Sequence, residues 1–255
     1  MTKGTFASID GVPIAYETSG EGTPLVFVHG WAGDRRVWDA QVRHFARTRR
    51  VVTIDLAGHG ESGASRADWT MAAFAEDVRA VVDALGLDQV VLVGHSMGGP
   101  VILEAAIRLP GRVAALVPVD SLQNVEPRTQ PGDQERFVQP FRADFAASAR
   151  RFVARLFRPG TDPALVERIA SGAAAFPAEA GTGILRHSWF YDARPALRQL
   201  TMPIRAINGD LFRTNIEAAR RYAPQFDVAF ITGVGHYPMI EQPDRFNALL
   251  EQAVR

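Results

Sequence analysis

Short apolar stretches alternate with longer amphipathic stretches along most of this chain. Wholly or almost wholly apolar runs are typical of strands buried in a parallel sheet, and they occupy residues 25–28, 51–54, 90–93, 113–119, 204–207 and 228–231. Near the start, strand-like residues 6–9 and 12–17 flank Asp10-Gly11, a dipeptide that favours a hairpin turn. This order predicts a mostly parallel central sheet with a hairpin at its N-terminal end.

Helical spacing of apolar residues separates these strands. Residues 34–48 and 70–85 each place their apolar side chains on one face, and Thr70 and Gly86 stand where a helix cap and a helix stop are expected. A last helix is predicted from Pro243, a residue favoured in the first turn. Helices between parallel strands cover both faces of the sheet, so the fold class predicted is α/β.

Residues 122–200 interrupt the alternation, because they contain no convincing strand. They are rich in Ala, Arg and Phe, and apolar residues recur at helical spacing over 141–157 and 163–175. We therefore predict a core formed by residues 1–121 and 201–255, with residues 122–200 as a helical insertion over the strand ends. This segment is called the insertion below.

Composition narrows the classes of partner and site. The 255 residues include 28 basic and 28 acidic side chains, so charge gives no reason to expect nucleic acid or an anionic membrane as a partner. The absence of cysteine excludes disulfides, thiolate zinc sites and cysteine nucleophiles. The six histidines show no short paired spacing, so no metal site is predicted.

With neither an apolar signal core nor a membrane-spanning run, we expect a cytoplasmic protein. Nothing in the sequence indicates an oligomeric state.

One motif assigns a role to a single atom. Gly94-His-Ser96-Met-Gly98-Gly follows an apolar strand and precedes a helical stretch, which is the strand–turn–helix setting of a nucleophile elbow. In that setting the sharp turn exposes the Ser96 hydroxyl, and glycines relieve the crowding of helix against strand. The motif predicts Ser96 as a nucleophile.

Two further segments follow strands whose carboxyl ends share one edge of the sheet, where an active site gathers. His236 lies on a glycine-rich loop after the last strand and is the predicted general base. A serine nucleophile also needs amide donors for the oxyanion. We expect one from Met97, directly after the nucleophile, and one from Trp31, after an early strand.

Together these motifs resemble the α/β-hydrolase fold family. His29-Gly30, the segment Asp55-Leu-Ala-Gly58-His59-Gly60-Glu-Ser62, the elbow and Gly235-His236 occur in that family's order, and the match covers the chain apart from the insertion. The resemblance implies a triad of Ser96, His236 and an acid, without a cofactor, and it implies that the insertion is a cap over the active site.

The acid has two candidates. The family usually places it after the next-to-last strand, where this chain has Asn208-Gly209-Asp210; the usual position three residues after the glycine is Phe212, so the pattern is broken there. The rival is Asp120, which ends the strand at residues 113–119 and matches the acid position of some branches of the family. Asp210 is the slightly preferred candidate, and Asp120 stays open.

We predict a serine hydrolase acting on a small, largely apolar ester, thioester or lactone, with His29, Gly30 and Trp189 in its substrate pocket. Trp189 could instead fasten the insertion to the core. The fold leaves other functions open: a carbon–carbon bond hydrolase, a cofactor-independent dioxygenase, a lyase, or a non-enzymatic ligand receptor with a vestigial triad.

Overall fold

A single sheet organises the computed structural model, which describes residues 1–126, 130 and 132–255. Its eight strands lie in the order β1-β2-β4-β3-β5-β6-β7-β8. The hairpin strands β1 (Thr2–Ala7) and β2 (Pro13–Ser19) are antiparallel to each other, and β2 is antiparallel to β4. The other neighbours are parallel. The predicted α/β class, the mostly parallel sheet and the N-terminal hairpin are therefore confirmed, although the first strand ends at residue 7 rather than 9.

Beyond the hairpin the sheet consists of six parallel strands, of which β8 forms the far edge: β3 (Pro24–Val28), β4 (Arg50–Ile54), β5 (Val90–His95), β6 (Val113–Val119), β7 (Ile204–Gly209) and β8 (Phe226–Ile231). Both faces of β3 and β5 are buried, which explains why their sequences are continuous apolar runs rather than alternating ones. The two strands are neighbours, with Val28 opposite Gly94, so the elbow lies at the middle of the sheet.

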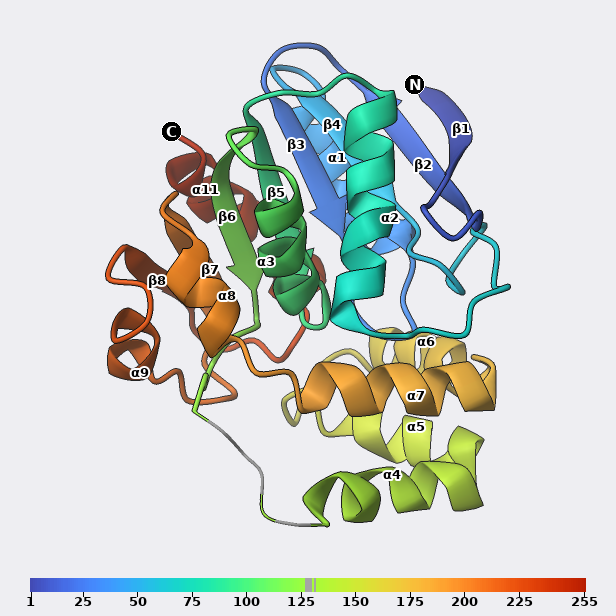
Figure 1. Ribbon diagram of the computed structural model, residues 1–255. Helices are drawn as coiled ribbons and strands as arrows, with labels where there is room; N and C mark the ends of the chain where they lie inside the picture. Colours follow the sequence, from blue (N-terminus) through green and yellow to red (C-terminus); the bar gives the residue numbers. More distant parts are fainter. Residues whose placement is uncertain (127–129, 131) are drawn as a thin grey trace.

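Helices cover both faces of this sheet (Figure 1). On one face lie α2 (Met71–Ala84), α3 (Gly98–Arg108) and α8 (Arg194–Gln199). On the other lie the 3-10 helix η1 (Arg35–Trp38), α1 (Asp39–Phe45) and α11 (Pro243–Ala253). The short helices α9 (Ile216–Arg220) and α10 (Pro238–Glu241) flank β8. The single helix predicted over residues 34–48 is thus two shorter elements, the first of them capped by the Asp34 carboxylate.

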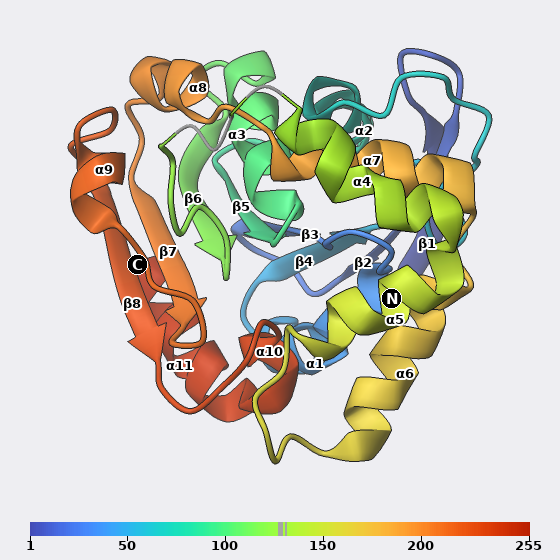
Figure 2. The same ribbon diagram turned by 90° about the horizontal axis from the view of Figure 1, so that it is seen from below.

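The insertion contributes four helices at the carboxyl ends of the strands: α4 (Asp133–Ala143), α5 (Phe145–Ala154), α6 (Pro163–Ala174) and α7 (Ala178–Trp189). Figure 1 shows them stacked below the sheet, and Figure 2 shows them over the half that holds β1 to β4. Helix α8, also within residues 122–200, returns to the sheet and packs beside α3. Part of the insertion, residues 127–129 and 131, lies outside the described residues.

The helical spacing noted over residues 141–157 is not that of one continuous helix. Its periodicity spans two helices, because Asp144 adopts an extended conformation with φ −154° and ends α4. The Asp144 carboxylate then accepts a hydrogen bond from the Ala147 amide at 3.0 Å and caps α5. Both helices keep their phenylalanines on the side that faces the core, which is why the spacing looked unbroken.

Trp31 fastens the insertion to the core. Its indole Nε1 donates a hydrogen bond to the Gly181 carbonyl of α7 at 2.8 Å. The ring stands edge-on to Phe141, Phe145 and Phe152, with centroids 5.7–6.1 Å away. A loop residue beside the elbow therefore lies directly under α4, α5 and α7. Within the described residues no helix is long and apolar enough to cross a membrane.

Candidate active site

Ser96 occupies the turn between β5 and α3. Its backbone φ is +53°, a strained value for a residue with a side chain, and the Ser96 amide is fixed by the Val119 carbonyl at 2.9 Å. The flanking glycines are sterically required: a Cβ on Gly98 would lie 2.6 Å from the Val28 carbonyl oxygen, and one on Gly94 would collide with the Gly98 backbone. The turn leaves Ser96 partly exposed in a pocket.

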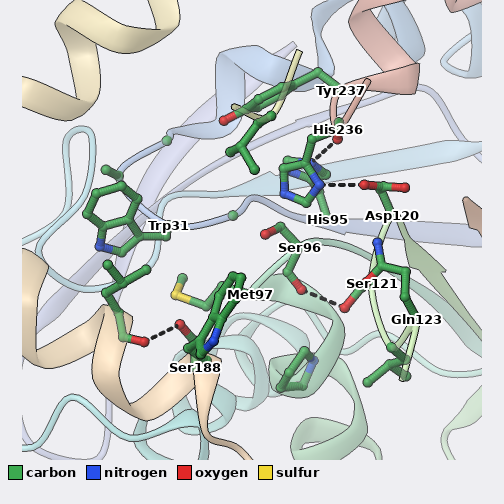
Figure 3. Close-up of a pocket in the computed structure, with 18 of the residues that line it drawn as sticks. Trp31, His95, Ser96, Met97, Asp120, Ser121, Gln123, Ser188, His236 and Tyr237 are labelled. Atoms are coloured by element: carbon green, nitrogen blue, oxygen red, sulfur yellow. Dashed lines mark hydrogen bonds and ion pairs between the residues drawn. The ribbon is translucent and has the colours of Figure 1, made fainter. Parts of the chain in front are cut away.

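His236 reaches the same pocket from the loop between β8 and α10. Its side chain is largely buried, and Nδ1–H donates to Asp120 Oδ2 at 2.5 Å. This hydrogen bond leaves Nε2 as the ring's acceptor. Figure 3 shows the Ser96 hydroxyl on the side of the His236 ring away from Asp120, so a hydroxyl, an imidazole and a carboxylate lie in sequence across the pocket.

Asp120 is held on both sides of its carboxyl group. It follows β6 directly with φ +41°, and its amide donates to the Ile207 carbonyl at 2.9 Å. While Oδ2 accepts from His236, Oδ1 accepts from the Gly209 amide at 2.8 Å. The side chain is 1% exposed. A fully buried carboxylate with two donors is a fixed acceptor for the imidazole.

Asp210 lies elsewhere, so our preference for it over Asp120 is corrected. β7 ends at Gly209, and the next side chain points outward, 37% exposed. Asp210 Oδ1 accepts from the Gly233 amide at 2.8 Å and pairs with Arg158 at 2.7 Å. It is Gly209, through its amide, that supports the acid held against His236.

The expected oxyanion donors lie next to the nucleophile. Trp31 lies in the loop after β3, Met97 directly precedes α3, and both line the pocket beside Ser96 (Figure 3). In the described part of the chain neither amide donates a hydrogen bond to another main-chain group. Both amides are therefore available as donors to an oxygen of a molecule bound beside Ser96.

The pocket above these groups has a volume of about 740 Å³. Its apolar walls come mainly from the insertion: Phe152, Leu156, Ile169, Ala173, Leu185 and Trp189. Of the three predicted pocket residues, Gly30 and Trp189 line it, and Trp189 also stacks on Phe137 with centroids 4.9 Å apart.

His29 does not line the pocket, contrary to expectation. It is fully buried, its Nδ1–H donates to the Gly30 carbonyl at 2.8 Å, and its Nε2 accepts from the Leu56 amide at 3.0 Å. Burial lowers its pKa, which keeps the ring neutral. His29 therefore shapes the loop that leads to Trp31.

Sequence reasoning missed Ser121 and Asn208 and gave His95 only a structural role, although all three support the residues of the pocket. Ser121 Oγ donates to the Ser96 carbonyl at 2.7 Å, and Asn208, fully buried, accepts from the Ser121 amide at 3.2 Å. His95 Nε2–H donates to the His236 carbonyl at 2.8 Å, and burial lowers the His95 pKa well below 6.5. Ser121 follows Asp120 directly and Asn208 lies two residues before Asp210. This closeness to the candidate acids is the sequence signal that could have found them.

No group of three or more His, Cys, Asp or Glu side chains that could hold a metal occurs within the described residues.

Comparisons with known proteins agree with this geometry. The family model described as alpha/beta hydrolase fold matches residues 23–182. A pimeloyl-(acyl-carrier protein) methyl ester esterase from Nitrosospira multiformis is 30% identical over 96% of this chain and 99% of its own length. The dihydrolipoyllysine-residue acetyltransferase component of an acetoin cleaving system from Pseudomonas putida is also 30% identical, over 91% of this chain. The chain spans 64% of that relative's length.

Solved structures give the same result. A thermophilic esterase from Thermogutta terrifontis superposes with a TM-score of 0.84 and 28% identity, covering 99% of this chain and 97% of the other. The family model covers well over half of the 255 residues. The chain therefore belongs to the α/β-hydrolase fold family.

Proposed function

We propose that the protein is a serine hydrolase that cleaves a small, largely apolar ester, thioester or lactone through an acyl-enzyme on Ser96. The observation that carries the proposal is the hydrogen bond from His236 Nδ1 to Asp120, which leaves His236 Nε2 free on the side where Ser96 lies. Relatives at 28–30% identity that are named esterases support the reaction class.

The first half-reaction acylates Ser96. His236 Nε2 takes the hydroxyl proton as Ser96 Oγ attacks the substrate carbonyl carbon. The carbonyl oxygen becomes an oxyanion, which the amides of Trp31 and Met97 stabilise; one such donor typically contributes about 3 kcal/mol. When the carbon–oxygen or carbon–sulfur bond breaks, His236 returns the proton to the leaving alcohol or thiol.

The second half-reaction releases the acid. A water molecule gives its proton to His236 and attacks the acyl carbon, and the resulting oxyanion is held by the same two amides. Collapse of this intermediate returns the proton from His236 to Ser96 Oγ. Throughout both steps Asp120 keeps the imidazole in one tautomer and stabilises the imidazolium by its charge.

The insertion supports the choice of substrate class. We propose that it acts as a cap, because its side chains Phe152, Leu156 and Trp189 form apolar walls above Ser96. A pocket of about 740 Å³ is within the usual size range for small-molecule sites. These walls favour apolar acyl or alcohol groups through burial of their surface.

The proposal is tested with a fluorophosphonate probe and p-nitrophenyl acetate. The wild type is expected to gain one phosphonyl group, mapped to Ser96 by peptide mass spectrometry, and to hydrolyse the ester. Ser96→Ala should lose both. Ser171→Ala is the matched control, since Ser171 does not line the pocket and its hydroxyl donates to Glu167 on α6. Absence of both labelling and ester turnover in the wild type overturns the proposal.

A further inference from the structure

The loop that carries His236 is fastened to two residues outside the triad. Asp210 accepts a hydrogen bond from the Gly233 amide at 2.8 Å, at the start of this loop. The same carboxylate oxygen pairs with Arg158 Nη2 at 2.7 Å. Arg158 Nε in turn donates to the Val234 carbonyl at 2.9 Å. Asp210 and Arg158 thus bind consecutive residues of the loop and also each other.

The segment of the insertion that carries Arg158 also contacts the base directly. The Leu156 carbonyl accepts a hydrogen bond from the His236 amide at 2.7 Å. A Cβ on Gly235 would lie 2.5 Å from that carbonyl oxygen and 2.9 Å from Phe157 Cα. Because the two backbones are this close, a shift of residues 156–158 displaces His236 itself.

The remaining supports of the loop come from the core. Glu241 accepts hydrogen bonds from the Gly235 amide at 2.9 Å and the Tyr237 amide at 3.0 Å. His95 donates to the His236 carbonyl. These contacts hold the C-terminal part of the loop. In its N-terminal part, Thr232 accepts from Arg245 at 3.4 Å, and Gly233 and Val234 are bound by Asp210 and Arg158.

We propose that Asp210 and Arg158 are positioning residues for His236, which keep its Nδ1 on Asp120 by locking residues 233–234 to the insertion. This inference rests on the proposed role of His236 as general base. An ordinary surface ion pair with side chains 32% and 37% exposed contributes little to stability. Here each partner also binds a backbone group of the loop, so the pair affects the position of His236. A displacement of about 1 Å in an active site lowers turnover strongly.

The test compares Asp210→Asn and Arg158→Met with the wild type, each alone and combined with Asp120→Asn. With p-nitrophenyl acetate we expect kcat to fall about 10-fold in each single variant while KM changes less than about twofold. Arg158→Lys should recover part of the loss. In the Asp120→Asn background the same changes should lower kcat less than about threefold, because the hydrogen bond that they preserve is already lost.

Asp227→Asn is the matched control. It also breaks an exposed arginine–aspartate pair, with Arg220 at 3.1 Å, but at the start of β8, away from the pocket. It should leave kcat unchanged. If Asp210→Asn behaves like Asp227→Asn, or lowers kcat by the same factor in both backgrounds, the positioning role is refuted.

A second measurement does not depend on turnover. Hydrogen–deuterium exchange followed by peptide mass spectrometry should show faster exchange over residues 233–237 in Asp210→Asn and Arg158→Met than in Asp227→Asn. Unchanged exchange refutes the positioning role even if the wild type proves inactive on esters. Inactivity of the wild type with faster exchange in the variants refutes the proposed function and leaves the positioning contacts supported.

Discussion

The substitution Asp120→Asn removes one of two carboxylate oxygens that both accept hydrogen bonds. Asp120 accepts from the Gly209 amide through Oδ1 and from His236 Nδ1 through Oδ2. An asparagine of the same shape has a single acceptor oxygen. If that oxygen faces Gly209, the amide NH₂ faces His236, and the imidazole must move its proton to Nε2. The nitrogen that should take the Ser96 proton then already carries one.

The expected loss follows from this wrong tautomer. In serine hydrolases the equivalent substitution lowers turnover by about 10⁴-fold, or about 5 kcal/mol of transition-state stabilisation. Burial makes the effect large here: the Asp120 side chain is 1% exposed, so water cannot replace the lost acceptor. Asp210→Asn should cost only about 10-fold, because Asp210 touches the loop and not the imidazole.

The assay is kcat/KM for p-nitrophenyl acetate at about pH 7.5, one unit above the ordinary histidine pKa of about 6.5. The melting temperature of each variant is followed by circular dichroism. Fluorophosphonate labelling of Ser96 should slow by a similar factor in Asp120→Asn. The reasoning is refuted if Asp120→Asn retains activity within about tenfold of the wild type while folded. It is equally refuted if Asp210→Asn loses as much as Asp120→Asn.

Two further predictions concern stability. Burial lowers the pKa of His29, His59 and His95 below the ordinary value of 6.5. Below that pH the unfolded chain therefore binds more protons than the folded one. The free energy of unfolding should therefore fall as pH drops from 7 to 5, by up to about 1.4 kcal/mol per histidine per pH unit, and a urea midpoint that does not move contradicts this. Gly98→Ala should destabilise the fold by about 1–3 kcal/mol, because its Cβ would lie 2.6 Å from the Val28 carbonyl oxygen. Gly172→Ala, with open space around its Cβ, is the control in the same urea titration.

The features that were predictable from sequence are those that local physics determines. Apolar runs such as residues 25–28 and 90–93 can be buried on both faces only in the middle of a parallel sheet, and they are found there. The elbow was recognisable because Gly94 and Gly98 are needed within one turn of Ser96. His236 was recognisable by its glycine-rich loop after the last strand.

Which carboxylate contacts His236 was not predictable, because it depends on how two strands end relative to each other. Asp120 reaches His236 through a left-handed backbone conformation at φ +41°, anchored by β7 at Ile207 and Gly209. Neither the conformation nor the register of β6 against β7 can be read from apolar spacing. The break at Asp144 was missed for a similar reason, since periodicity records which side is buried and not whether the axis continues.

The contact between residues 156–158 and the His236 loop sets a rule for building chimeras. An insertion exchanged between members of this family along the limits 122 and 200 would replace the Leu156 carbonyl and the Arg158 side chain that contact the His236 loop. Grafts that keep residues 156–158 of this chain should retain catalysis and change selectivity alone. In the design of chimeras, residues 156–158 belong with the core, although they lie in the middle of the insertion.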